Sequence, residues 1–321
     1  MNCDLLVEGE AVLTLDAGWR IFEPGYVAVR DGAIVAVGPA SEAFRWEASR
    51  RLGGLSRLVM PGFVNTHTHV AMAAFRGAGE DVDDRLVRFL FPLEKRLVGR
   101  ELVYEASLFC LAEMARSGTT TFADMYYFED EVARAAKLAG LRGLLGETIV
   151  DFPAPDAASP YGGLDYGRRF ISDWKGDKLI TPCFAPHAPY TVDAEHLAVI
   201  REESDAQDLP FMMHVAEGIP EAGRFAASHG SVVKYLESIG VLGKRLVAAH
   251  MIHVDEEDVA ILARRDVSIA HCPASNAKSG RPIAPAWRYR EAGLRLGLAT
   301  DGPISGNGMD MQGITGLYPK L

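Results

Sequence analysis

The chain has 321 residues, 48% of them hydrophobic and 24% charged, a balance typical of a globular protein with a substantial buried core. Its formal net charge of −10 argues against the clustered basic residues of a nucleic-acid-binding surface and favours a small-molecule partner. The sequence has no signal-peptide pattern, no apolar run of about 18 residues and no paired motif among its four cysteines. Together these features predict a cytoplasmic protein that binds neither nucleic acid nor membrane.

Residues 1–57 consist of short runs of alternating apolar residues, which predict β-strands. Between two of these runs, Arg30-Asp31-Gly32 predicts a hairpin turn, because glycine adopts positive φ at little cost. None of the residue types in this segment suggests chemistry. We therefore expect residues 1–57 to form a small β-sandwich portion that serves packing.

From residue 58 onward, segments typical of strands alternate with segments typical of helices. The predicted strands are 58–64, 119–124, 141–150, 179–185, 210–217, 246–250, 267–271 and 294–300. The predicted helices include 81–97, 100–117, 129–139, 193–207, 255–264 and 283–292. Strands that alternate with helices form a parallel sheet, and eight of them can close into a (β/α)8 barrel of the TIM type. We assign residues 58–311 to this barrel and treat 312–321 as an atypical tail.

Side chains able to bind metal or transfer protons lie at the ends of the predicted strands. His67 and His69 follow the first strand, and residues two apart in extended chain project to the same side. The later strands end at His187, His214 with Glu217, His250, His271 and Asp301. A single histidine at a strand end is more often structural than functional, but the joint arrangement predicts a site, because barrel active sites lie at this face. Three histidine nitrogens with one aspartate oxygen suit Zn²⁺ or Fe²⁺.

Five strings resemble the amidohydrolase superfamily. They are Pro61–His69, His214–Glu217, Ala249–His250, Ser268–Asn276 and Thr300–Gly302. They are most similar to the aminohydrolase branch that includes S-adenosylhomocysteine/5′-methylthioadenosine deaminases, guanine deaminase and the s-triazine hydrolases. The resemblance covers most of residues 1–311 and implies a distorted barrel with a flanking β-sandwich. It also implies a homo-oligomer and a further C-terminal portion, which 312–321 does not resemble.

The same resemblance implies roles for individual residues. One divalent metal, zinc first and iron as the alternative, is expected on His67, His69, His214 and Asp301. A single ion is favoured because His187 stands where two-metal members of the superfamily carry a lysine. Glu217, His250 and Asp301 are then the expected catalytic residues, with Glu217 as proton carrier and His250 orienting the attacking water.

Substrate contacts are expected from two further positions. The segment Phe91–Glu94 resembles one that places a glutamate on ribose hydroxyls, and His187 resembles a substrate-contacting histidine. The expected reaction converts an adenine nucleoside derivative, namely S-adenosylhomocysteine, 5′-methylthioadenosine or adenosine, to its inosine form plus ammonia. For Glu94, the alternative is a solvated helix residue. For the substrate, the alternative is guanine, a pterin or an s-triazine. A non-catalytic scaffold is a third alternative.

Three residues near these motifs receive less specific assignments. His271 and Cys272 are expected to line the pocket rather than bind metal. Arg76 could meet the polar tail of a substrate or form a structural ion pair.

Overall fold

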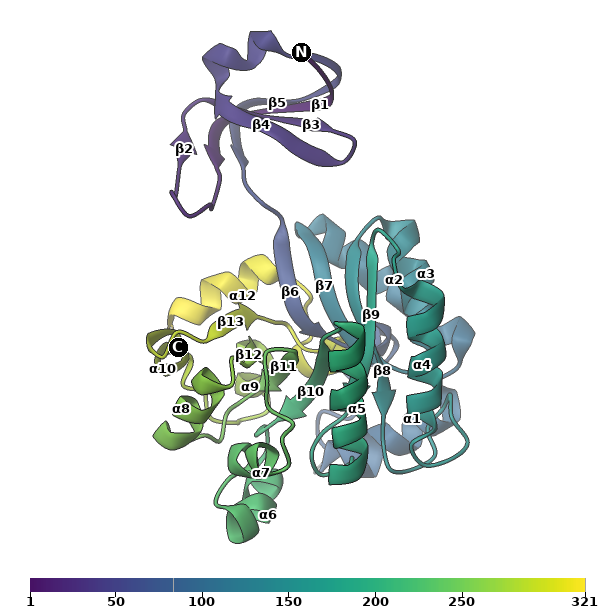
Figure 1. Ribbon diagram of the computed structural model, residues 1–321. Coiled ribbons are helices and arrows are strands. Elements are labelled where there is room, and N and C mark those ends of the chain that lie inside the picture. The colour runs from purple at the N-terminus through teal and green to yellow at the C-terminus, as the bar shows by residue number, and fades with distance from the viewer. Residues whose placement is uncertain (83, 321) are drawn as a thin grey trace. The chain divides into compact units, whose positions relative to one another are not determined.

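The computed structural model describes residues 1–82 and 84–320, and its contacts divide the chain into two units, Met1–Gly62 and Phe63–Leu321 (Figure 1). The first unit is a five-stranded sheet in which β1 pairs antiparallel with β2 and β3 and parallel with β5, while β4 pairs with β3. Its elements are β1 (Asn2–Leu13), β2 (Ile21–Phe22), β3 (Gly25–Arg30), β4 (Ala33–Pro39), the 3₁₀ helix η1 (Ala40–Arg45) and β5 (Glu47–Val59). The sheet domain predicted from the alternating runs is therefore present.

The β3–β4 hairpin confirms the predicted turn. Asp31 and Gly32 have φ values of 51° and 74°, the left-handed conformation that a tight hairpin requires of its two central residues. The small core of this unit includes Leu6 and Trp46, and the Trp46 indole donates a hydrogen bond of 3.1 Å to the Tyr26 hydroxyl. The indole N–H is thereby satisfied although the ring is buried.

The second unit contains an eight-stranded parallel sheet whose strand order follows the sequence. Its strands are β6 (Phe63–Thr68), β7 (Thr119–Tyr126), β8 (Arg142–Ile149), β9 (Ile180–Pro186), β10 (Phe211–Val215), β11 (Leu246–His250), β12 (Ser268–His271) and β13 (Arg295–Leu298). Between the first and last strands, the Thr66 hydroxyl donates to the Leu298 carbonyl at 3.0 Å. Asn65 and Thr300 exchange two further hydrogen bonds, of 2.7 and 3.1 Å. The predicted distorted TIM-type barrel is confirmed.

Helices follow the strands of the barrel sheet (Figure 1). They are η2 (Val70–Phe75), η3 (Leu86–Leu90), α1 (Phe91–Leu97), α2 (Arg100–Arg116), α3 (Glu129–Ala139), α4 (Gly162–Trp174), α5 (Ala194–Gln207), α6 (Ile219–His229), α7 (Val232–Ser238), α8 (Glu256–Arg264), α9 (Pro273–Lys278), α10 (Ala286–Glu291), α11 (Pro303–Gly306), α12 (Met311–Leu317) and η4 (Tyr318–Lys320). Within residues 1–82 and 84–320, no helix is both long and apolar enough to cross a membrane.

The structure corrects three helix predictions. The helix predicted over 81–97 begins later, because Asp84 adopts a φ of 49° that is incompatible with helix, and residue 83 lies outside the described residues. Helix α4 was not predicted. The tail treated as atypical begins with a helix, α12, whose start is capped by Asp310, which accepts a hydrogen bond from the Gln312 amide at 2.9 Å.

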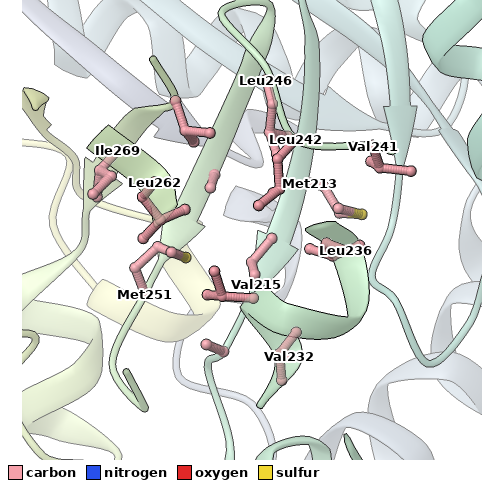
Figure 2. Close-up of a cluster of buried hydrophobic side chains, with 14 of the residues drawn as sticks. Met213, Val215, Val232, Leu236, Val241, Leu242, Leu246, Met251, Leu262 and Ile269 are labelled. Carbon is pink, nitrogen blue, oxygen red and sulfur yellow. The ribbon is translucent and has the colours of Figure 1, made fainter. Parts of the chain in front are cut away.

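Alternation along β10 separates the core from the barrel interior. Met213 and Val215 pack outward in a cluster with residues such as Leu236 of α7 and Leu262 of α8 (Figure 2). Met212, which precedes Met213, packs instead in a separate cluster with side chains of β7 and β9, namely Ala123, Met125, Cys183 and Ala185. Because side chains alternate along a strand, His214 shares the inward direction of Met212. The strand therefore stabilises the fold with one face and carries the polar residue on the other.

The hydrogen bonds between Asn65 and Thr300 generate a stability prediction. Asn65 and Thr300 are both fully buried, so Asn65→Ala would remove the acceptor of the Thr300 amide and one hydrogen bond to the Thr300 hydroxyl. We expect the free energy of unfolding to fall by about 1–3 kcal/mol. Guanidinium unfolding of both metal-free proteins measures the difference. Val64→Ala, at an exposed position of the same strand, serves as the control and should change stability by less than about 0.5 kcal/mol.

Candidate metal centre and active site

The carboxyl ends of three strands, β6, β10 and β13, bring His67, His69, His214 and Asp301 together. The ligand-type nitrogens of the three histidines lie within 4.8 Å of one another, and all three side chains are buried. Oδ1 of Asp301 lies 3.8 Å from His67 Nε2 and 3.4 Å from His69 Nε2. The Asp301 amide also donates to the His67 carbonyl at 3.2 Å, which links the last strand directly to the first. The four side chains predicted as metal ligands thus converge on one point.

Hydrogen bonds behind these side chains fix their orientation. His69 Nδ1 lies 2.6 Å from the Met125 carbonyl, and His214 Nδ1 lies 2.8 Å from the His187 carbonyl. A carbonyl oxygen can only accept, so Nδ1 carries the proton in both rings and the lone pair of Nε2 faces the centre. The Ser275 hydroxyl donates to Asp301 Oδ2 at 2.6 Å, which leaves Oδ1 facing the histidines.

The protonation states of these groups suit a cation. Burial lowers the pKa of His67 well below its usual value, and the neighbouring His69 lowers it further. Burial and His69 likewise lower the pKa of His214 to about 4. For Asp301, burial raises the pKa, but the nearby His250 and His69 outweigh burial and the net shift is downward. Neutral imidazoles and an ionised carboxylate are the forms in which these residues bind metal.

An unsatisfied atom points to the same conclusion. Among the described residues, His67 Nε2 is buried without a hydrogen-bond partner. Such a polar atom is costly in a protein interior unless something binds it. Three nitrogen donors and one oxygen donor are a set that can hold a divalent metal, and zinc or iron favours such a set more than magnesium or calcium does.

Glu217 and His250 lie beside this centre. Oε1 of Glu217 is 3.7 Å from His250 Nε2, and the Nδ1 atom of His250 lies 3.1 Å from Oδ1 of Asn276. Arg281 forms an ion pair with the same Glu217 oxygen. Burial raises the pKa of Glu217, but the opposing charges of His250 and Arg281 dominate and lower it overall. Glu217 is therefore an ionised carboxylate able to accept a proton.

Unusual backbone conformations accompany the site. Ala216, His250 and Asp301 have φ values of 53°, 73° and 64°, in the left-handed region that non-glycine residues seldom occupy. Each costs about 1–3 kcal/mol when held there by its surroundings. The Ile252 amide, for example, donates to the Ala216 carbonyl at 2.9 Å. These conformations change the direction of the backbone where the chain leaves β10, β11 and β13.

A cavity of about 830 Å³ opens onto the metal centre, within the 300–1,000 Å³ range of small-molecule sites. Glu94 and His187 both line it. Glu94 is only 2% exposed, and its Oε1 accepts a hydrogen bond of 2.6 Å from the Tyr126 hydroxyl. Burial raises the pKa of Glu94 to about 7. The ring of His187 lies 5.9 Å from that of Phe91, which also lines the cavity.

Glu94 is therefore buried in the wall of the cavity, which contradicts the alternative of a solvated helix residue. Arg76 pairs with Glu113 at 2.6 Å, which supports the structural alternative considered for it.

His271 and Cys272 are both buried. His271 packs 5.9 Å from the Tyr318 ring and has a pKa lowered to about 4 by burial. Cys272 forms a second grouping with His67 and His250, but burial raises the pKa of its thiol well above the usual value, which disfavours the thiolate that a metal needs.

Three residues beside the metal-type cluster were not predicted from the sequence. Ser275, Asn276 and Arg281 contact Asp301, His250 and Glu217 respectively. The string Ser268–Asn276 contains the first two, but it was singled out only because it resembles a family pattern, and neither residue was assigned a role. Nothing local in the sequence marks Arg281, because its partner lies 64 residues away.

Comparison with known proteins extends these observations. A sequence profile described as the amidohydrolase family matches residues 58–318. The chain is 41% identical over 324 residues to a 5-methylthioadenosine/S-adenosylhomocysteine deaminase of Syntrophobacter fumaroxidans, an alignment that covers 100% of this chain and 74% of that protein.

Two solved structures are also similar. An adenosine deaminase from Xanthomonas campestris with bound zinc matches with a TM-score of 0.94 and 35% identity, over 98% of this chain and 72% of that one. An atrazine chlorohydrolase from Arthrobacter aurescens complexed with zinc matches with a TM-score of 0.85 and 22% identity, over 95% and 74% of the two chains. The second likeness concerns the fold alone.

The geometry predicts which histidines hold the metal. His214→Ala removes one of three converging nitrogens, and we expect this variant to lose stoichiometric metal on dialysis. His271→Ala is the matched control, since His271 is equally buried but belongs to neither grouping of ligands found among the described residues. Elemental analysis of the dialysed proteins measures the metal content. Equal metal loss from both variants, or full retention by His214→Ala, would contradict the assignment.

Proposed function

This chain belongs to the amidohydrolase family, and on that premise we propose that it removes the amino group of an adenine nucleoside derivative by hydrolysis. The observation that carries the proposal is one cavity that joins the convergent metal-type residues to a buried carboxylate, Glu94. The names of the similar deaminases support the same chemistry. The expected products are the inosine form of the nucleoside and ammonia.

We propose that His67, His69, His214 and Asp301 hold a single divalent metal, with zinc favoured. A metal held there would lower the pKa of a bound water toward neutrality and so supply a nucleophile at neutral pH. The zinc bound in the similar adenosine deaminase supports this choice of ion. The side chains themselves supply the remaining chemistry, because they are positioned to carry protons and to exclude solvent.

Two carboxylates divide the proton transfers. The water oxygen bonds to the ring carbon that bears the amine while Glu217 accepts one water proton and delivers it to the adjacent ring nitrogen. Asp301 carries the second proton to the amine, the carbon–nitrogen bond breaks, and ammonia leaves. His250, 3.7 Å from Glu217, orients the water and stabilises its developing charge. The lowered pKa values of Glu217 and Asp301 suit both for the initial acceptance of a proton.

Glu94 and His187 are assigned to the substrate. An ionised carboxylate that accepts hydrogen bonds from two vicinal hydroxyls selects a ribose. Burial of Glu94 excludes competing water, and the Tyr126 hydroxyl holds one of its oxygens in place. A cavity of about 830 Å³ also exceeds what a free base or a triazine would fill. These features favour a nucleoside over guanine, a pterin or an s-triazine.

A reducing cytoplasm is the compartment we propose for this reaction. All four cysteines are free and buried, as expected where disulfides do not form.

The direct test is incubation of the metal-loaded protein with adenosine, 5′-methylthioadenosine and S-adenosylhomocysteine. We expect the ultraviolet absorbance to shift from the adenine to the hypoxanthine chromophore, with ammonia released in equal amount. Guanine and a chlorinated triazine serve as comparison substrates. Turnover of these two alone would replace the nucleoside assignment, and no turnover of any compound by the metal-loaded protein would contradict the proposed function.

Replacement of Glu94 tests the ribose contact. We expect Glu94→Gln to lower kcat/KM for ribosides by about 10- to 100-fold, the effect of losing hydrogen bonds to a charged group. For a 2′,3′-dideoxynucleoside, which has no vicinal hydroxyls, the variant and the wild type should differ little. An equal loss on both substrates would show that Glu94 does not act through the ribose.

The stability of Glu94→Gln shows whether the variant is folded, and the structure predicts how that stability depends on pH. Burial raises the pKa of Glu94 from 4.5 to about 7, so between these values the folded protein binds more protons than the unfolded chain. Stability therefore falls as pH rises through this window. Glu94→Gln removes the free-energy cost of ionising a buried carboxyl group. The variant should raise the free energy of unfolding by up to about 3 kcal/mol above about pH 8, with no gain below about pH 4. Denaturant unfolding at the two pH values measures this.

A further inference from the structure

Arg281 lies in the loop between α9 and α10 and reaches the proposed proton carrier. Its Nη1 atom pairs with Oε1 of Glu217, and both residues line the cavity. The side chain of Arg281 is 36% exposed, whereas that of Glu217 is 19% exposed. An ion pair between a half-exposed cation and a largely buried carboxylate is stronger than one on the open surface, because water screens it less.

The backbone fixes the base of the Arg281 side chain. The Arg281 amide donates to the Asn276 carbonyl at 2.9 Å, and the Asn276 side chain in turn lies 3.1 Å from His250 Nδ1. One short segment therefore contacts both groups that flank the attacking water. Ser275, one residue earlier, holds Asp301. Residues 275–281, which include the end of α9 and the start of the following loop, thus form part of the active centre.

The contacts of Glu217 show what Arg281 can do. Within residues 1–82 and 84–320, the side-chain contacts of this carboxylate, to Arg281 and to His250, both involve Oε1. With Oε1 fixed, Oε2 is the oxygen left to receive and deliver a proton. The neighbouring backbone is held separately, because the Glu217 amide donates to Glu221 Oε2 at 2.8 Å. A carboxylate without the guanidinium would keep its main-chain position but could rotate about its side-chain bonds.

We propose that Arg281 is a positioning residue of the reaction, which anchors Oε1 of Glu217 so that Oε2 faces the water and the substrate ring. This inference rests on the proposed function, in which Glu217 transfers the proton. Burial raises the pKa of Glu217, but His250 and Arg281 lower it overall, which is consistent with the same arrangement. Misplacement of a catalytic group by about 1 Å costs about 100-fold in rate, so the anchor acts on kcat rather than on substrate affinity.

Three variants of Arg281 test the inference. We expect Arg281→Gln to lower kcat by about 10- to 100-fold while KM stays within about threefold. Arg281→Lys keeps the charge without the planar fork and should recover part of kcat. Arg281→Ala should regain activity on addition of free guanidinium or ethylguanidinium at concentrations that leave the fold intact. Arg265→Gln, which breaks a surface ion pair with Glu237, is the matched control and should behave as the wild type.

Metal content and melting temperature are measured for every variant, so that loss of metal or fold is recognised. A second readout does not depend on the substrate. Crystal structures of the wild type and Arg281→Gln should show the Glu217 carboxylate turned away from its wild-type orientation, with His67, His69 and His214 unmoved.

The outcomes separate the two proposals. An inactive wild-type protein overturns the proposed function, and the crystal structures then still decide whether Arg281 orients Glu217. An active wild type with unchanged kcat in Arg281→Gln overturns the positioning role. A raised KM with normal kcat also overturns it, because Arg281 would then bind substrate directly.

Discussion

The site depends on closure of the barrel between β6 and β13. His67 and His69 come from the first barrel strand and Asp301 from the turn after the last, so this carboxylate and these two imidazoles are 232 residues or more apart in the chain. They meet because Asn65, Thr66 and the His67 carbonyl bond to residues at the end of β13. The hydrogen bonds that complete the sheet are thus also those that assemble the donor set.

Burying polar side chains is unfavourable unless they have partners, and carbonyl and hydroxyl groups supply partners to His69, His214 and Asp301. Met125, His187 and Ser275 provide these contacts. The barrel interior beneath them is filled with small or flexible side chains such as Ala123, Cys183 and Met212. Close packing there leaves the imidazoles little freedom to rotate, so their lone pairs stay directed at one point.

Local patterns in the sequence predicted eight strands and the polar residues at their ends, because buried parallel strands are short apolar runs followed by a change of direction. The first strand was misplaced at 58–64: residues 58–59 belong to β5, and the first barrel strand is β6 at Phe63–Thr68. Helix α4 was missed for a tertiary reason. A side chain at Gly163 would lie 2.2 Å from the Thr148 carbonyl, so glycine is needed for close packing on β8 although it weakens the helix. The pairings of Arg281 with Glu217 and of Tyr126 with Glu94 could not be predicted either. Contacts between distant segments leave no periodic signal, and motif likeness identified only one partner of each pair.

The His187 carbonyl accepts from both the backbone amide and the Nδ1 atom of His214, at 3.0 and 2.8 Å. The same residue presents its ring to the cavity. Under the proposed roles, one residue therefore touches the substrate with its side chain and steadies a metal ligand with its main chain. Occupancy of the two sites is then linked, and linkage is reciprocal. By whatever factor the bound ion raises the affinity for the nucleoside, the bound nucleoside raises the affinity for the ion. In a cell where free metal is scarce, abundant substrate would help to keep the enzyme loaded.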